Sequence, residues 1–203
     1  MGLEGRGEMK TASIIINAVI FLTTLAILIF YFRKDGAWQL AKGLKAFRFF
    51  TVLSNAFCAL AALAMAVSQL GGEPSPAVLL MKYLGTVSVT VTLLTVFLFL
   101  GPSMGGYGEL LSRDNLYMHL IGPVLAILSY CLLEKRGMSF GTAMTGLIPV
   151  ALYGAVYLYK VVLSPEDGRW EDFYGFNKGG RWPIAFGAMV AGTAIVCVVF
   201  WLV

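Results

Sequence analysis

His119 is the only histidine in the chain, and it lies near the start of the apolar stretch 116–133. An ionisable side chain at membrane depth is costly, so it is a functional-site hypothesis by default. The apolar stretches contain almost no other acid or base. Proton transfer inside a bilayer would therefore use this imidazole, which in its neutral form can act as a general base toward a hydroxyl nucleophile.

Hydroxyl and amide side chains form a stripe on another apolar stretch. Thr51, Ser54, Asn55 and Cys58 follow the spacing i, i+3, i+4, i+7, which puts them on one face of a helix. Interhelical packing through small polar groups is the alternative explanation for Ser54 and Cys58. Asn55 needs partners in a membrane core, and it could either orient a catalytic group or bridge two helices.

Thr51 and His119 share one depth in the membrane. If their helices begin near residues 47 and 115, each residue lies four positions in, about 6 Å down at the helical rise. A hydroxyl and an imidazole that face each other at one level are the minimum for a nucleophile and its base. Ordinary helix packing explains the threonine equally well.

Composition predicts an integral membrane protein, because 59% of the residues are hydrophobic and 13% are charged. We expect an all-α bundle of six transmembrane helices that forms a single domain over 1–203. The connections are short, and no cysteine or histidine spacing typical of a metal site occurs, so neither a metal nor a cofactor is expected. The predicted spans are 11–32, 47–70, 78–100, 115–133, 142–163 and 182–203.

Lys and Arg are distributed unevenly between the two sides of such a bundle. Most of them fall in the connections 33–46, 101–114 and 164–181 or next to them. The positive-inside rule then predicts that the basic loops 33–46 and 164–181 are cytoplasmic. The net charge of +4 therefore indicates orientation rather than a nucleic-acid partner. Segment 38–49 interleaves apolar and basic residues and fits either a helix in the headgroup layer or a basic collar on the second span.

Other segments bring side chains to the level of Thr51 and His119. Tyrosines at this height are more often interface anchors than catalytic groups. Two acids just outside the bilayer, Asp114 and Asp172, could orient the imidazole. The supporting residues that we expect near the site are Ser54, Asn55, Arg48, Thr95, Tyr157 and Trp182.

Two segments carry a family resemblance. Residues 47–55, FRFFTVLSN, and 117–123, YMHLIGP, resemble the androgen-induced-gene-product family of small multi-pass membrane proteins, and the chain looks like a bacterial-type relative. The resemblance covers most of the chain in its layout of spans, and the aromatic loop before the last span adds to it. Animal members hydrolyse fatty-acid esters of hydroxy fatty acids with an intramembrane threonine nucleophile and a histidine. The matching residues here are Thr51 and His119.

The expected function is therefore lipid-ester hydrolysis within the bilayer, with Asn55, Arg48 or a tyrosine as the oxyanion stabiliser. Acyl transfer between lipids is an enzymatic alternative that uses the same two residues. A transporter or a lipid-binding protein is a third possibility, although no second intramembrane charge pairs with His119 and no inverted repeat is visible. A purely structural histidine, bonded to Asn55 or to a backbone carbonyl, is the fourth.

Overall fold

Six helices in the computed structural model are long and apolar enough to cross a membrane. The structure describes residues 3–203, and almost all of the regular structure in this part is helical. The predicted all-α fold with six membrane-spanning helices is confirmed, and each predicted boundary falls within four residues of the observed one. The spans are Gly7–Tyr31, Phe50–Gly71, Pro76–Ser103, Arg113–Glu134, Phe140–Leu163 and Trp182–Leu202.

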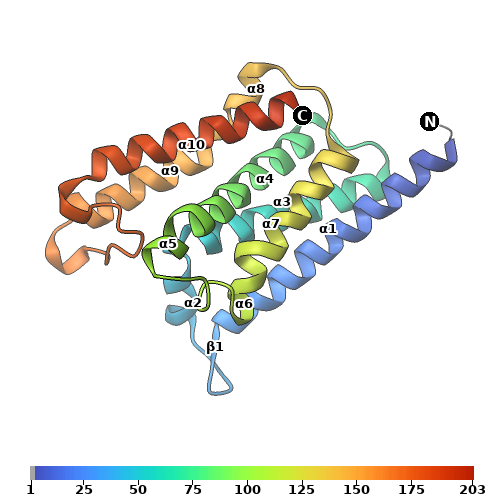
Figure 1. Ribbon diagram of the computed structural model, residues 1–203. Helices are drawn as coiled ribbons and strands as arrows, with labels where there is room; N and C mark the ends of the chain where they lie inside the picture. The colour runs from blue at the N-terminus through green and yellow to red at the C-terminus, as the bar shows by residue number, and fades with distance from the viewer. Residues whose placement is uncertain (1–2) are drawn as a thin grey trace. The chain divides into compact units, whose positions relative to one another are not determined.

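The chain forms two compact units, Met1–Gly137 and Met138–Val203. The expectation of a single transmembrane domain stays a prediction. In the first unit the four spans make a bundle, in which α1 and α4 each contact both α3 and α7 (Figure 1). The helical segments of these spans are α1 (Leu3–Tyr31), α3 (Phe50–Gly71), α4 (Pro76–Thr95), η1 (Val96–Leu100), α5 (Gly101–Ser103), α6 (Arg113–Leu116), η2 (Tyr117–Ile121), α7 (Gly122–Ser129) and η3 (Tyr130–Glu134).

Small residues let α3 and α4 approach closely. A Cβ added at Gly85 would lie 3.0 Å from the Cα of Cys58 and 3.5 Å from the Cβ of Ala61. Ala61 and Ala62 are fully buried. Close backbone approach through Gly and Ala is how helices gain packing energy in a bilayer, where lipid is as apolar as the side chains. This contact fixes α3, and with it Thr51, against the bundle.

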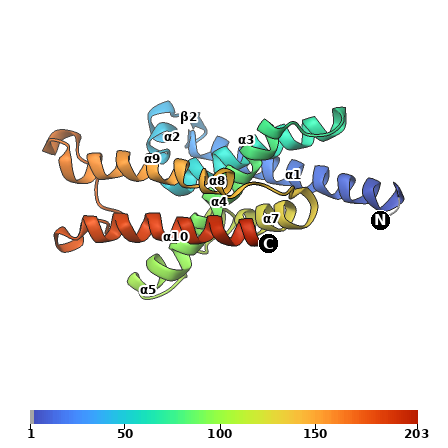
Figure 2. The ribbon, with the colours of Figure 1, turned by 90° about the horizontal axis from the view of Figure 1, so that it is seen from above.

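The second unit pairs two antiparallel helices, which run alongside each other in Figure 2. A Cβ at Gly154 would lie 2.3 Å from Met189 Cε, so glycine permits the close contact. The fifth span is interrupted at residues 145–146, ahead of Pro149, whose ring would clash with the carbonyl of Thr145 in a continuous helix. The segments are α8 (Phe140–Met144), α9 (Leu147–Leu158), η4 (Tyr159–Leu163), η5 (Glu166–Gly168), η6 (Lys178–Gly180) and α10 (Trp182–Leu202).

A charged network lies inside the first unit, and the expectation of almost no other acid or base in the spans is wrong. Lys82 Nζ lies 3.5 Å from Glu134 Oε2, and both side chains are fully buried. Glu134 Oε1 accepts hydrogen bonds from Ser13 (2.7 Å), Ser129 (2.5 Å) and Asn17. The Asn17 side-chain carbonyl in turn accepts from Lys82. The network joins α1, α4 and the end of the fourth span.

The network stabilises the bundle only while it is complete, because removing one partner leaves an uncompensated buried charge. We predict that Glu134→Gln or Lys82→Met lowers the unfolding free energy by about 3–5 kcal/mol. The double variant Lys82→Met/Glu134→Leu, which removes both charges, should show a much smaller decrease in unfolding free energy. Thermal unfolding in one detergent measures all three variants.

The exposed pair Arg136–Glu73, with an N–O separation of 2.7 Å, supplies the control. Glu73→Gln should change stability by less than about 1 kcal/mol, as surface ion pairs do. A Glu134→Gln variant as stable as Glu73→Gln would contradict the role given to the network.

Candidate active site

Thr51 lies in the first turn of α3, which begins at Phe50 after the turn that follows α2 (Leu40–Ala46). The residue before the helix, Phe49, has no side-chain cap. The first backbone N–H groups of a helix have no intrahelical partner, and the helix dipole is positive at this end. The Thr51 side chain is half-buried, so its hydroxyl is placed beside a region that favours negative charge.

His119 lies in a π-helical turn, η2, directly before Gly122 and Pro123. Pro123 has no N–H to donate, and its ring would clash with the His119 carbonyl in a regular α-helix. The wider turn accommodates the proline, and single π-helical turns are frequent at functional sites. His119 is 7% exposed, so its ring is held among protein groups.

The two ring nitrogens of His119 face different partners. Nδ1 is 2.6 Å from the Leu110 carbonyl oxygen, and Nε2 is 3.4 Å from Thr51 Oγ1. A carbonyl can only accept, so Nδ1 carries the proton and donates it to Leu110. In the neutral ring Nε2 is then the acceptor. The Thr51 hydroxyl donates to it across a distance somewhat longer than a close hydrogen bond, as in many sites without substrate.

The Leu110 carbonyl is held by the loop between the third and fourth spans. Tyr107 Oη donates to the Phe97 carbonyl at 2.9 Å, and its ring covers Gly101, where a Cβ would lie 2.0 Å from the ring. Asn115 Nδ2 donates to the carbonyl of Glu109, next to Leu110, at 3.2 Å. The loop therefore has a fixed path into the site.

The orienting acceptor is thus a backbone carbonyl rather than either expected aspartate. Asp114 Oδ2 accepts a hydrogen bond from Tyr31 at 2.7 Å. Asp172 belongs to the second unit, where Oδ1 accepts from Tyr157 at 3.0 Å. A backbone acceptor has no signature in the sequence, because every residue supplies one.

Asn55 ties the two candidate residues together through the backbone. Its Nδ2 donates to the Thr51 carbonyl at 2.8 Å and to the Met118 carbonyl at 2.9 Å. Both amide hydrogens are therefore engaged, and Asn55 has none left for an oxyanion. Of the two roles that the sequence left open, the structure places Asn55 as a bridge between α3 and η2.

The remaining supporting candidates of the first unit lie around this centre. Ser54 Oγ lies 3.1 Å from the Thr51 carbonyl and 2.8 Å from Thr92 Oγ1, which links α3 to α4. Thr95 is half-buried at the last residue of α4, and Arg48 is exposed three residues before Thr51.

Tyr157 and Trp182 belong to the second unit, and their contacts are made there. Tyr157 is 1% exposed, and its hydroxyl accepts a hydrogen bond from the Tyr174 N–H at 3.2 Å. Trp182 packs against the same aromatic cluster. The structure therefore brings together Thr51, Ser54, Asn55 and His119, and it gives Tyr157 and Trp182 a common cluster of their own.

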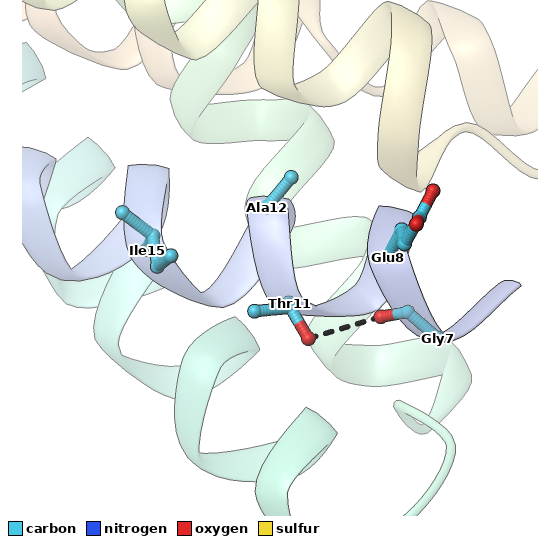
Figure 3. A pocket seen from close by; sticks show the side chains of 5 residues that line it. All are labelled: Gly7, Glu8, Thr11, Ala12 and Ile15. Atoms are coloured by element: carbon cyan, nitrogen blue, oxygen red, sulfur yellow. Dashed lines mark hydrogen bonds between the residues drawn. The ribbon is translucent and has the colours of Figure 1, made fainter. Parts of the chain in front are cut away.

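A hollow at the N-terminal end of α1 offers no comparable chemistry (Figure 3). The Thr11 hydroxyl in it donates to the Gly7 carbonyl of the same helix at 3.0 Å, an ordinary local bond. The lining residues are Gly7, Glu8, Thr11, Ala12 and Ile15.

Scans against protein-family models, curated proteins and solved structures find no match to the chain. The family resemblance therefore rests on the two short segments that contain Thr51 and His119 and on the aromatic loop before the last span.

We predict that Asn55→Asp lowers the unfolding free energy by about 2–5 kcal/mol, because it removes two buried hydrogen bonds and turns a carboxylate toward two carbonyls. Thermal unfolding measures this loss. The same change at Asn115, whose amide makes a single exposed bond, should cost less than half as much. Equal effects would contradict the bridging role.

Proposed function

We propose that the protein is an intramembrane hydrolase of lipid esters, such as fatty-acid esters of hydroxy fatty acids, with Thr51 as nucleophile and His119 as general base. One observation carries the proposal. The contact of Nδ1 with the Leu110 carbonyl leaves the Nε2 lone pair facing the Thr51 hydroxyl. Threonine is a weak nucleophile and needs such a base.

The reaction would proceed in two halves. Thr51 Oγ attacks the ester carbonyl while its proton passes to His119 Nε2. The tetrahedral intermediate expels the alcohol, which takes that proton, and an acyl-threonine remains. Water then gives a proton to Nε2 and attacks the acyl group, and the proton returns to Thr51 Oγ as the fatty acid leaves. The Leu110 carbonyl supports the imidazolium at each stage by accepting from Nδ1.

The oxyanion of both tetrahedral intermediates needs donors. We assign this role to the backbone N–H of Thr51 in the first turn of α3, supported by the positive end of the helix dipole. The N–H groups of Val52 and Leu53 already donate to the Phe49 carbonyl. Asn55 is not the donor in this scheme, since both of its amide hydrogens are bonded to carbonyls.

Acyl transfer to a second lipid uses the same first half, with an alcohol in place of water. A non-catalytic role in transport or lipid binding is favoured by one other observation, the buried Lys82–Glu134 pair, because charges inside a membrane often mark ion pathways.

Orientation is part of the proposal. We infer that the basic segments 33–46 and 164–181 face the cytoplasm, following the positive-inside rule. Thr51 and His119 would then lie on the cytoplasmic side of the bilayer, where water reaches the acyl-threonine.

Thr51→Ala and His119→Gln should each lower ester hydrolysis by at least about a hundredfold, because each removes one partner of the proton transfer. Thr51→Ser retains the hydroxyl and should retain measurable activity. Fatty-acid release from a detergent-solubilised lipid ester, followed by mass spectrometry, measures the rate. A fluorophosphonate probe should label the wild type and fail to label Thr51→Ala.

Thr11→Ala is the matched control, because Thr11 bonds only within α1; its rate and labelling should equal those of the wild type. Full activity in Thr51→Ala with unchanged folding would rule out Thr51 and His119 as the catalytic pair. An acceptor lipid that becomes acylated at the expense of free acid would identify a transferase. Absence of both turnover and labelling would favour the non-catalytic alternative.

A further inference from the structure

The connection between the first two spans is a folded element rather than a loop. The strands β1 (Arg33–Lys34) and β2 (Ala37–Trp38) form an antiparallel hairpin, which leads into α2. The Gln39 N–H donates to the Phe32 carbonyl at 2.7 Å. The sequence fitted either a helix in the headgroup layer or a basic collar over 38–49. The structure has the seven-residue helix α2 within that range and a hairpin before it.

One face of α2 is fixed to the bundle. Gly43 is buried against the Phe32 ring, where a Cβ would lie 2.1 Å from the nearest ring atom. Lys42 Nζ donates to the Arg33 carbonyl at 2.8 Å, closing the hairpin onto the helix. In Figure 1, β1 and α2 lie at the end of the bundle where α1 stops. Because this side of α2 is held against Phe32, the remaining sides of the helix point away from the bundle.

A second face is apolar and exposed. Trp38, Leu40 and Leu44 are 64%, 67% and 57% exposed. Leu40 and Leu44 are one turn apart and share a side of α2. The segment joins the end of one span, Tyr31, to the start of the next, Phe50, so it lies at the membrane boundary. Exposed tryptophan and leucine at this level fit the acyl side of the headgroup layer.

Basic side chains of the hairpin and of α2 surround the apolar residues. Arg33, Lys34, Lys42 and Lys45 are exposed, and no ion pair joins them to a carboxylate among residues 3–203. The Arg33 guanidinium lies 5.3 Å from the centre of the Trp38 ring, which brings a cation to the edge of the apolar face. In α2, Lys42 and Lys45 lie roughly opposite Leu40 and Leu44.

We propose that segment 33–46 is a binding surface for anionic phospholipid headgroups. Its apolar face would lie against the acyl chains, and its ammonium and guanidinium groups would contact the phosphates. Anionic lipid fits because the cluster carries four cations and a single acid, Asp35, and basic clusters beside a span attract such lipids by about fivefold in affinity per lysine. The proposal does not depend on hydrolase activity, because the occupant need not be the substrate.

Lipid retention tests the proposal directly. The full chain is reconstituted in phosphatidylcholine nanodiscs with a minor fraction of phosphatidylglycerol, extracted gently and weighed by native mass spectrometry. We expect phosphatidylglycerol to be retained over phosphatidylcholine. The double variant Lys34→Gln/Lys45→Gln, which leaves the bond from Lys42 to Arg33 intact, should lower that retention at least tenfold. Leu44→Ser should lower it without a change of charge.

The matched control is Lys10→Gln/Lys135→Gln, which removes the same charge from α1 and from the end of the fourth span, outside segment 33–46. Equal retention by the two double variants would overturn the proposal, because retention would then follow net charge. Displacement of the lipid by inorganic phosphate at equal concentration would overturn the lipid as occupant. Thermal unfolding in pure phosphatidylcholine checks that all variants fold alike.

Discussion

A polar group inside a bilayer must find its hydrogen-bond partner within the protein, and the first unit meets this constraint in two layers. In one layer Glu134 pairs with Lys82 and accepts hydrogen bonds from three neutral side chains. In the other, Asn55 joins the carbonyls of Thr51 and Met118. His119 and Glu134 are fifteen residues apart on one span, about 22 Å at the helical rise. The layers therefore hold opposite ends of the bundle.

The proposed chemistry depends on the second layer. Asn55 sets the separation of α3 and η2, the π-helical turn aims the ring, and the Leu110 carbonyl selects its tautomer. The carbonyls of Thr51 and Met118 that Asn55 joins lie within two spans, and the Leu110 carbonyl lies in the loop between the third and fourth spans. Orientation of a base and a nucleophile before substrate binds supplies much of the rate enhancement of an enzyme. In the proposed chemistry, the bonds of Asn55 that join two spans would also set the separation of the base and the nucleophile.

Much of the fold and part of the site could be predicted from the sequence. Span lengths follow from hydropathy, and counting residues from the helix starts paired Thr51 with His119, although α3 begins three residues later than expected. Lys82 falls within the predicted span 78–100, but its pairing with Glu134 could not be predicted because the two residues come from distant segments. The Leu110 carbonyl could not be predicted as the acceptor for His119, because every residue has a backbone carbonyl and the sequence does not distinguish one from another. Pro123 was the one local signal of the altered turn around His119.

The tautomer of His119 decides whether its Nε2 can accept the Thr51 proton. Since the chain has a single histidine, ¹⁵N NMR of protein labelled in the histidine ring reports on this imidazole alone. We expect a neutral ring that is protonated at Nδ1 and unprotonated at Nε2, with the Nε2 resonance shifting in Thr51→Val because the hydroxyl donor is lost. A proton on Nε2, or an Nε2 resonance that Thr51→Val leaves unchanged, would contradict this expectation.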